Sequence, residues 1–401
     1  MRRELIVSAD PGEWRAALVE DGAVVELRVE RGDGYEAGSV HLGRILRQVP
    51  GLGAALVDMG GDRPAFLPQS QIFPRGRRLD EGERVVVQIR REAQGGKAPR
   101  LTMAMAPPGR SGELSPGRRW QEIGARSARL EPPARLYPEA TLAAALAGAL
   151  PAIDRVVTDE PGAIPEIRAA FPDVEVVNEP ESRWPIDLDA LFDEALSPVI
   201  AVPGGGSVHF EPARAATLID VDTGTPETGS PERTALAVNL AAAAVIARQL
   251  RLRPLGGSIV VDFVGLDDRA ARDKVRTALA RAVAADPARP EILGWTRLGH
   301  LELVRPRRLR PLGEVLLDTP SGGNPNKTAV AIAHEALRQL RREERARPGH
   351  RWRLTVAPDV KAALTGLAAS AVHAFEQRSG RKIAIADDPS LARGQFQISP
   401  A

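Results

Sequence analysis

Residues 216–263 decide the fold: ATLIDVD (216–222) and SIVVDF (258–263) stand on either side of the alanine-rich stretch NLAAAAVIARQLRLRPLGG (239–257). The two outer pieces are apolar runs that end in the aspartates Asp220 and Asp262. A strand, helix, strand unit of this length is normally parallel and right-handed, because the helix carries the chain back across one face of the sheet. Both aspartates should therefore emerge at the same edge of the sheet, where open α/β sheets bind their ligands.

The two aspartates predict a divalent-metal site. Neither strand contains a lysine or arginine that could neutralise them, and neighbouring carboxylates repel one another unless a cation lies between them. Oxygen ligands of this kind suit magnesium, with manganese as the alternative ion. Asp222 lies on the same strand face as Asp220. It is equally consistent with metal ligation and with capping the turn DTGTPETG.

Composition excludes several classes of protein. The chain has 401 residues, which predicts two to four domains, and it contains no cysteine. Disulfides, zinc–thiolate sites and cysteine nucleophiles are therefore excluded, which fits a cytoplasmic protein. The sequence contains no apolar run of 18 residues or more, so it predicts no membrane-spanning helix. Its N-terminus lacks the pattern of a signal peptide. Only 5 of the 54 basic residues are lysine. A GC-rich genome explains most of this bias, although arginine also suits phosphate binding.

Element patterns divide the chain into α/β and β segments. Residues 1–35 predict short strands with a hairpin at Glu20–Gly22, and 36–106 predict about five strands that form a small barrel. Residues 107–119 are rich in proline, glycine and serine and indicate a linker. Residues 120–205 mix helices and strands, 206–319 form the main α/β block, and 320–401 comprise a second linker with a small α/β domain. In the main block we expect strands near 207–210, 216–222, 257–264 and 291–296, and helices near 231–252 and 267–284.

In the barrel, Phe66 is the candidate stacking aromatic for single-stranded nucleic acid, although a buried core ring is equally consistent with its pattern. Arg44, Arg47 and Lys97 would supply positive charge beside it. The six histidines have no metal-ligand spacing, so we assign none of them a catalytic role.

These motifs, in this order, resemble the catalytic half of the bacterial ribonuclease E/G family. The resemblance covers most of the chain, and the stretches that match most clearly are GRILRQVPGLGAALVDMG, AFLP, GGSVHFEPARAATLIDVDTG, NLAAAAVIARQLRLRPLGGSIVVDF and TRLGHLELVRPRRL. The resemblance implies an RNase H-like fold with an inserted S1-type OB barrel, a DNase I-like catalytic domain and a small C-terminal domain. The implied activity is magnesium-dependent endonucleolytic cleavage of single-stranded RNA. Asp220 and Asp262 would be the catalytic, magnesium-binding pair. Arg297 and Arg305 would contact RNA in addition to the barrel residues.

The chain also departs from the family pattern. Asp222 replaces the asparagine that is usual in the family, and Ala241 replaces the acidic residue that usually follows Asn-Leu in the long helix. Leu56 replaces a second aromatic residue that the family has in its barrel. The cysteines with which family members share zinc between protomers are absent. We therefore expect no bound zinc, and any homodimer would not be linked by zinc. The module that senses a 5′-monophosphate is missing between LTMAMAPPG and RRWQEIGARSARLEPPARLY.

Three hypotheses follow. The first is an active endoribonuclease that cleaves ribosomal precursor or messenger RNA without 5′-end sensing. The second is a degenerate RNA-binding or ribosome-associated factor, motivated by the lost zinc link, sensor and barrel aromatic. The third is a metal phosphodiesterase that acts on another nucleic acid, because a metal-bound phosphate site does not by itself select RNA.

Overall fold

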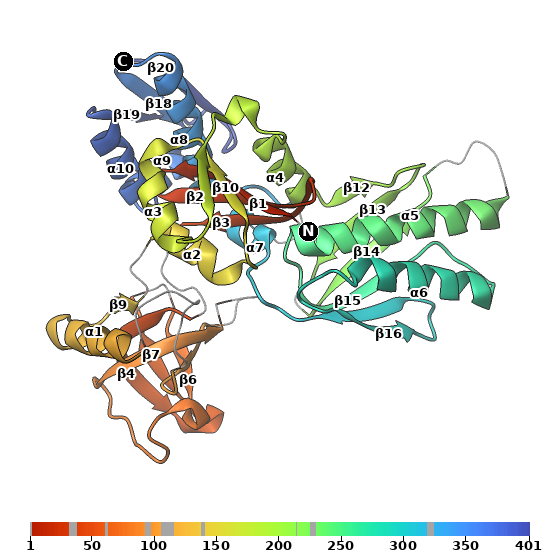
Figure 1. The fold of residues 1–401 in the computed structure, drawn as a ribbon, viewed down its shortest axis with the longest axis horizontal. Helices are drawn as coiled ribbons and strands as arrows, with labels where there is room; N and C mark the ends of the chain where they lie inside the picture. The colour runs from red at the N-terminus through yellow and green to blue at the C-terminus, as the bar shows by residue number, and fades with distance from the viewer. Residues whose placement is uncertain are drawn as a thin grey trace. The chain divides into compact units, whose positions relative to one another are not determined.

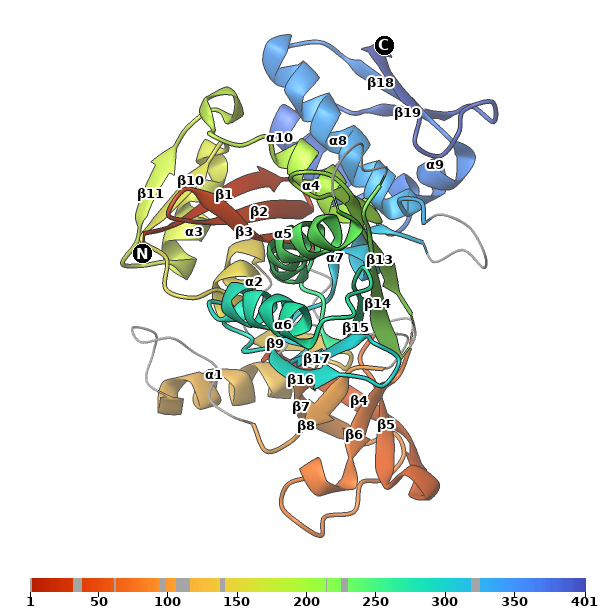
Figure 2. The same ribbon diagram turned by 90° about the vertical axis from the view of Figure 1, so that its right-hand side faces the viewer.

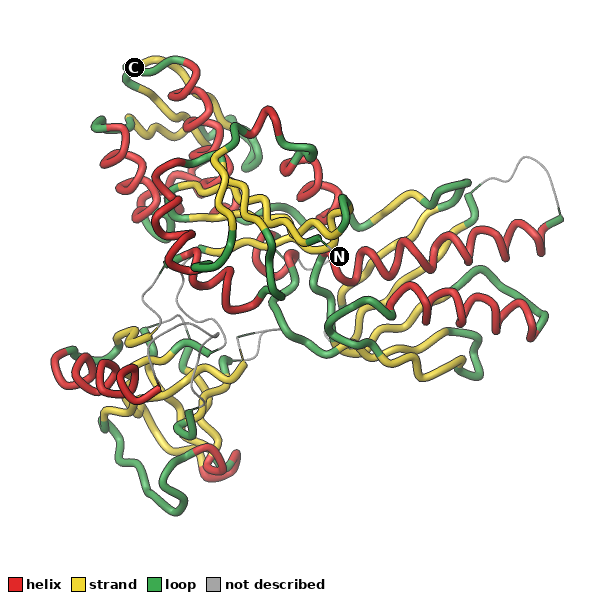
Figure 3. Tube along the Cα trace, viewed as in Figure 1, coloured by secondary structure: helices red, strands yellow, loops and turns green. Residues whose placement is uncertain are grey.

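The computed structural model describes residues 2–31, 38–60, 63–91, 93, 98–105, 116–137, 141–213, 215–224, 230–318 and 325–401. These residues form two compact units (Figure 1). The first unit comprises mainly Ala16–Leu27 and Arg183–Leu317, and the second comprises Arg3–Arg15, Arg28–Ser182 and Asp318–Ala401. Both units contain helices and strands, so the mixed α/β class predicted from the sequence is confirmed (Figure 3).

A six-stranded sheet forms the centre of the first unit, with the strand order β12-β13-β14-β15-β17-β16. Its strands are β12 (Val199–Ala201), β13 (Ser207–Pro212), β14 (Ala216–Asp222), β15 (Gly257–Asp262), β16 (Glu291–Trp295) and β17 (Leu301–Arg305). The helices of this unit are α4 (Leu188–Leu196), α5 (Pro231–Leu252), α6 (Arg269–Val283) and α7 (Leu312–Leu316). β14 and β15 are parallel, whereas the other four pairings are antiparallel. The predicted parallel strand, helix, strand unit is therefore confirmed; the short edge strand β12 and strand β17 were not predicted.

Helices α5 and α6 lie side by side over one face of this sheet (Figure 2). Every second residue of β14 and β15 is buried, and Ile219, Val221, Ile259 and Val261 pack with α5 and α6 in one apolar core. The alternate residues of the two strands, which include Asp220 and Asp262, are exposed or half-buried. Strand periodicity thus decides which side chains enter the core and which remain available for chemistry.

Helix α5 is long and apolar enough to cross a membrane, judged by length and composition alone. However, 56% of its most apolar window is buried within the protein. Ala242, Ala243, Ile246 and Leu250 of this helix are fully buried in the core against the sheet. Its hydrophobicity is that of a core helix.

The predicted barrel is present in the second unit as a closed ring of five strands. The strands are β4 (Val40–Val49), β5 (Ala54–Asp58), β6 (Ala65–Pro68), β7 (Arg84–Arg91) and β8 (Arg100–Thr102). Their order is β5-β6-β8-β7-β4, and a β4–β5 pairing closes the ring. β6 and β8 are parallel and the other pairs antiparallel. Inward-facing residues such as Ile45, Val57, Leu67, Val87 and Leu101 fill the interior.

Two further elements pack on the barrel. Strand β9 (Ala134–Tyr137) pairs with β4, and helix α1 (Pro116–Arg129) places Ile123 against Val40, Leu42 and Leu136. We expected residues 120–205 to form one segment with the second part of the RNase H-like fold. The apolar side chains of α1 and β9 instead complete the barrel, so the boundary lies after Tyr137. Most of the predicted linker, residues 107–115, lies outside the described residues.

A five-stranded sheet has the order β11-β10-β1-β2-β3. Its strands are β1 (Arg3–Asp10), β2 (Glu13–Glu20), β3 (Ala23–Glu30), β10 (Arg155–Thr158) and β11 (Glu175–Asn178), and the helices of this region are α2 (Leu142–Ala149) and α3 (Ile164–Ala170). β1, β10 and β11 run parallel. The predicted hairpin at Glu20–Gly22 is confirmed: Asp21 and Gly22 both have positive φ, as a two-residue hairpin turn requires.

The C-terminal segment is a small α/β layer. Its sheet has the order β19-β18-β20, with β18 (Trp352–Val356), β19 (Ala384–Asp387) and β20 (Phe396–Pro400). Helix α8 (Ala329–Ala346) matches the helix predicted near 327–345. The single helix predicted near 358–377 is two helices, α9 (Pro358–Thr365) and α10 (Ala369–Ser379), which Gly366 separates with φ −117° and ψ −102°.

A buried ionic cluster joins α8 to strand β2. Glu13 forms ion pairs with Arg338 and with Arg31, the latter at 2.7 Å. Burial by itself raises the pKa of Glu13, but the two guanidinium groups outweigh it and lower the pKa to about 2. Burial also lowers the pKa of the neighbouring His334 to about 4, although Glu13 opposes this shift. His334 is therefore neutral in the folded protein at neutral pH.

Candidate active site at the ends of strands β14 and β15

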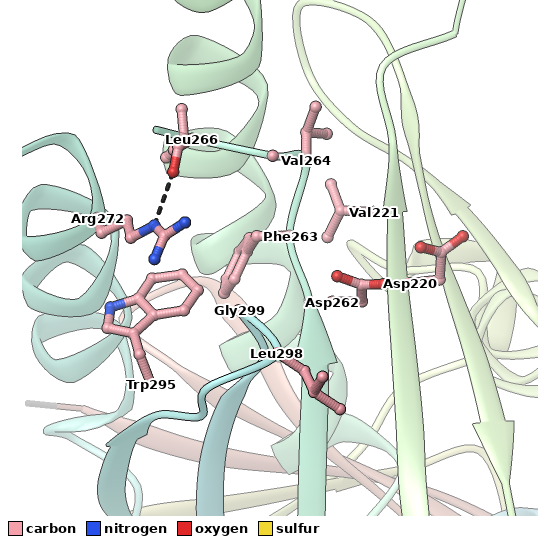
Figure 4. A pocket seen from close by; sticks show the side chains of 11 residues that line it. Asp220, Val221, Asp262, Phe263, Val264, Leu266, Arg272, Trp295, Leu298 and Gly299 are labelled. Carbon is pink, nitrogen blue, oxygen red and sulfur yellow. Dashed lines mark hydrogen bonds between the residues drawn. The ribbon is translucent and has the colours of Figure 1, made fainter. Parts of the chain in front are cut away.

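The two predicted catalytic aspartates lie directly beside one another. Asp220 is the register partner of Asp262 in the parallel β14–β15 pair. Adjacent strands are about 4.8 Å apart, and both side chains are exposed on the sheet face opposite the helices. Figure 4 shows the two carboxylates at the ends of neighbouring strands. The sequence prediction that the chain brings these residues together is confirmed at the level of the backbone register.

Neither carboxylate is neutralised by a guanidinium or ammonium group in the part of the chain that the structure describes. Asp220 has no hydrogen-bond or ion-pair partner there, and the nearest basic group to Asp262 is His300, whose Nε2 lies 3.7 Å from Oδ2. The described residues contain no group of three or more histidine or acidic side chains spaced to hold a metal. Magnesium needs no such cage, because it keeps several waters and is commonly held by one or two carboxylates and a substrate phosphate. The pair therefore fits magnesium bound in that open manner.

A pocket of about 350 Å³ opens beside the pair (Figure 4). Asp220 and Asp262 line one part of it, and the other part is formed by residues that follow β15, by helix α6 and by the β16–β17 turn. Its volume falls in the range of small-molecule sites. Two carboxylates at the mouth of a pocket partly lined by apolar residues make this the strongest candidate site among the described residues.

Asn239 of α5 holds the chain immediately after Asp262. Its Nδ2 donates to the Val264 carbonyl oxygen at 2.8 Å, and its Oδ1 accepts from the Val264 amide at 3.0 Å. Asn239 is fully buried and Val264 is half-buried, so these two bonds are partly shielded from water. Asn239 is a positioning residue that the sequence analysis missed. The available signal was a polar residue on the buried face of an apolar helix, a pattern that requires a hydrogen-bond partner.

Asp222 caps the turn after β14. Its Oδ1 accepts a hydrogen bond from the Gly224 amide at 2.8 Å, which is the capping role that the sequence left open. Metal ligation by its second oxygen stays a prediction.

Two histidines lie beside the aspartates. His209 is the register partner of Asp220 on β13, where its Nε2 and the Ser207 hydroxyl form a hydrogen bond at 2.9 Å. His300 approaches Asp262 from the residue before β17. Neither was assigned a role from the sequence, because the histidines show no metal-ligand spacing along the chain. The sheet register brings them together across long sequence separations.

A second candidate surface lies on the outside of the barrel. Strand register places Arg47, Leu56, Phe66 and Arg100 in one row across β4, β5, β6 and β8. Phe66 is half-buried and points away from the barrel core, with the Arg100 guanidinium 5.7 Å from its ring centre. Of the two alternatives for Phe66, the structure therefore excludes the buried core ring. Arg100 was not identified from the sequence, because only the pairing of β8 with β6 in the barrel places it beside Phe66.

The remaining predicted RNA contacts have different environments. Arg44 donates to the Gly82 carbonyl oxygen at 3.2 Å and forms an ion pair with Glu131 at 3.6 Å. Arg297 is exposed on the β16–β17 turn, and Lys97 lies outside the described residues. Arg305 is a correction: it is buried, and its guanidinium binds Asp286 at 2.7 Å and the Leu255 carbonyl oxygen at 2.7 Å. Arg305 stabilises the first unit and is not available to RNA.

Comparison with known proteins finds similar ribonucleases. The model of the ribonuclease E/G family matches residues 114–308, which contain Asp220, Asn239 and Asp262. Over these residues the chain is similar to the ribonuclease E/G family. Ribonuclease G of Escherichia coli (strain K12) is 25% identical over 490 aligned residues, which cover 99% of each chain. Ribonuclease E of Nostoc sp. (strain PCC 7120 / SAG 25.82 / UTEX 2576) is 27% identical over 384, covering 76% of this chain and 56% of the relative. Ribonuclease G of Haemophilus influenzae (strain ATCC 51907 / DSM 11121 / KW20 / Rd) is 25% identical, covering 84% of this chain and 87% of the relative.

The chain is shorter than the similar ribonuclease G from Escherichia coli. The alignment of 490 positions exceeds the 401 residues of this chain by 89. Because the alignment covers 99% of both chains, the difference lies in internal gaps and not at the ends. A loss of this size is that of a small domain.

Proposed function

We propose that this protein is a magnesium-dependent endoribonuclease that cleaves single-stranded RNA at Asp220 and Asp262. The observation that carries the proposal is the β14–β15 register, which sets two exposed and unneutralised carboxylates side by side. The match to the ribonuclease E/G family supports the ribonuclease class, as do the similar proteins ribonuclease G and ribonuclease E.

Each part of the site has a role in this proposal. Asp220 and Asp262 hold the magnesium ion, which when bound supplies Lewis acidity to the scissile phosphate and an activated water. Asn239 fixes the backbone after Asp262, so that the carboxylate keeps its position during turnover. The barrel row of Arg47, Phe66 and Arg100 binds the single strand through phosphate contacts and stacking.

We also infer the finer architecture from these features. The barrel ring joins its strands in the order first, second, third, fifth, fourth, with the third and fifth parallel, which supports an S1-type OB barrel. In OB folds the face of the second and third strands binds oligonucleotides, and here that face carries Leu56 and Phe66. The parallel β14–α5–β15 unit in a mixed sheet supports the DNase I-like assignment, and the β11-β10-β1-β2-β3 sheet supports the RNase H-like one.

The shortened chain supports cleavage that does not depend on the 5′ end of the RNA. The missing positions are as numerous as a small domain, and the sequence lacks the segment between residues 107 and 119 where the family carries its 5′-sensing module. RNAs with a 5′-monophosphate and with a 5′-hydroxyl should therefore be cut at rates within about two-fold of each other. A strong preference for the monophosphate would contradict this part of the proposal.

The test uses the full-length protein and a short single-stranded RNA that carries a fluorophore and a quencher. We expect cleavage with magnesium, none after chelation with EDTA, and a loss of at least about 10³-fold in Asp262→Asn. Asp267→Asn is the matched control, because Asp267 is exposed and nearby but does not line the pocket. Equal activity of Asp262→Asn and wild type would refute the assignment.

A second candidate function is RNA binding without catalysis. The observation that favours it is the thin barrel platform, where Leu56 stands beside Phe66 in place of a second ring. Salt-dependent RNA binding with no magnesium-dependent turnover would support this candidate over the first. Equal cleavage of single-stranded DNA in competition would instead indicate a nuclease without selectivity for RNA.

A further inference from the structure

We propose that the pocket beside Asp220 and Asp262 is a nucleobase subsite, in which Trp295 stacks on a base next to the scissile phosphate and Arg272 selects guanine. This inference deepens the proposed function and rests on it, because it names the nucleotide that the same site prefers. The pocket is defined by its lining residues and its volume of about 350 Å³.

An aromatic wall forms the side of the pocket away from the carboxylates. Trp295 ends β16 and is partly exposed, and its ring centre lies 6.0 Å from that of Phe263, which follows Asp262. Phe263 is buried, also lines the pocket, and lies between the indole and the carboxylates in Figure 4. Leu298, on the turn after β16, is 84% exposed at the pocket rim. An exposed leucine and a partly exposed indole at one opening provide apolar surface of the kind on which a base stacks.

Arg272 presents hydrogen-bond donors beside the indole. Its Nε donates to the Leu266 carbonyl oxygen at 2.7 Å, which fixes the guanidinium, and its Cζ lies 5.9 Å from the Trp295 ring centre (Figure 4). Its two Nη atoms have no partner within the described ranges. A fixed guanidinium with two free donors matches the adjacent O6 and N7 acceptors of guanine, whereas adenine presents a donor at position 6.

The Trp295 indole provides a second, independent indication of a missing ligand. Its Nε1 is buried and has no hydrogen-bond partner in the described part of the chain. An indole N–H buried in this way costs free energy unless an acceptor reaches it. Figure 4 shows this nitrogen on the side of Arg272, so a base that binds Arg272 would bring its acceptors toward the same point.

The position of the pocket connects base recognition with cleavage. Asp220, Asp262, Trp295 and Arg272 line one continuous cavity. A base held against Trp295 therefore places the phosphate of its own or the next nucleotide near the two carboxylates. The subsite would act on the choice of cleavage site and on KM more than on the chemical step.

Binding of free nucleotides tests the subsite without catalysis. The probe is the intrinsic tryptophan fluorescence of the Asp262→Asn protein, titrated with guanosine 5′-monophosphate and with adenosine 5′-monophosphate in the absence of magnesium. We expect quenching, with about ten-fold tighter binding of the guanosine nucleotide. Trp295→Phe should remove the quenching, and Arg272→Gln should retain it but lose the preference. Arg276→Gln, an exposed arginine one turn further along α6 that contacts Asp273, should behave as the parent.

Cleavage of RNAs that differ in one nucleotide tests the link to function. We expect cuts next to guanosine, and a rise in KM of about ten-fold for Arg272→Gln with kcat little changed. Quenching without any cleavage would leave the subsite standing and refute the nuclease proposal. Cleavage with no difference between Arg272→Gln and Arg276→Gln, or quenching that persists in Trp295→Phe, would refute the subsite alone.

Discussion

Substitution of Asn239 by alanine should lower both stability and activity. The Asn239 side chain is fully buried and forms two hydrogen bonds with the backbone of Val264, at 2.8 and 3.0 Å. Each bond contributes about 1 kcal/mol net, and leaving both Val264 groups unpaired costs about 1–3 kcal/mol for each group. Partial access of water to Val264, which is not fully buried, reduces the total. We expect a loss of about 3 kcal/mol, a large share of the roughly 5–15 kcal/mol that stabilises a domain.

Activity should fall because Val264 is two residues after Asp262. Release of this backbone lets the carboxylate move, and a displacement of about 1 Å in an active site costs about 10²-fold in rate. Urea unfolding gives the stability change, and single-turnover cleavage of the fluorophore-labelled RNA gives the rate.

Gln249→Ala provides the matched control for Asn239. Gln249 is also fully buried on α5, and its Nε2 donates to Glu194 at 2.8 Å, but it lies about 15 Å further along the helix. The control should lower stability without changing kcat. A change of less than about 0.5 kcal/mol in Asn239→Ala, or equal loss of kcat in the two variants, would refute the reasoning.

Four further predictions concern other parts of the molecule. Asp222→Asn should keep cleavage within a few-fold of wild type, since an asparagine oxygen can still accept from the Gly224 amide; a loss as large as that of Asp262→Asn would instead indicate a metal ligand. His334→Gln should flatten the acid dependence of stability. The pKa of His334 is about 4 in the folded protein, against 6.5 for the free group. As the pH falls, the unfolded state therefore gains a proton first, and the stability of the fold decreases between pH 6.5 and 4. In urea unfolding, the wild type should lose about 2 kcal/mol more stability than the variant between pH 7 and pH 5. Leu56→Phe should tighten the binding of single-stranded RNA by about 1–3 kcal/mol, because it adds a second stacking ring. Arg100→Gln should reduce the slope of log K against log salt by about 0.7. Fluorescence anisotropy at several salt concentrations checks both predictions, and an unchanged slope would show that Arg100 does not bind RNA.

Local sequence patterns were sufficient to predict most elements of the first unit. The apolar runs of β14 and β15 and the alanine-rich α5 lie within a few residues of their predicted bounds. Such elements are set by periodicity and by residues that start and end them. The same patterns predicted that Asp220 and Asp262 would meet, because a parallel strand, helix, strand unit leaves little freedom in where its strands end.

The assignments that failed depended on contacts between distant residues. Arg305 was expected to contact RNA, but burial against Asp286 makes it structural. Residues 120–137 were expected to begin an α/β segment, yet Ile123 and Leu136 pack on the barrel. Charge and local propensity carry no information about which partner a side chain will find.

The sequence by itself determined the ordered elements, the family resemblance and the pair of strand-end carboxylates, because each depends on residues close together in the chain or on a single crossover. Only the tertiary structure decided what surrounds that pair. The Asn239 clamp, the neighbouring His209 and His300, and the pocket formed by Trp295 and Arg272 come from four different elements and the turns between them. Their proximity follows from the way in which helices pack on a sheet and strands choose their neighbours, and these choices are made by the burial of apolar surface across the whole unit.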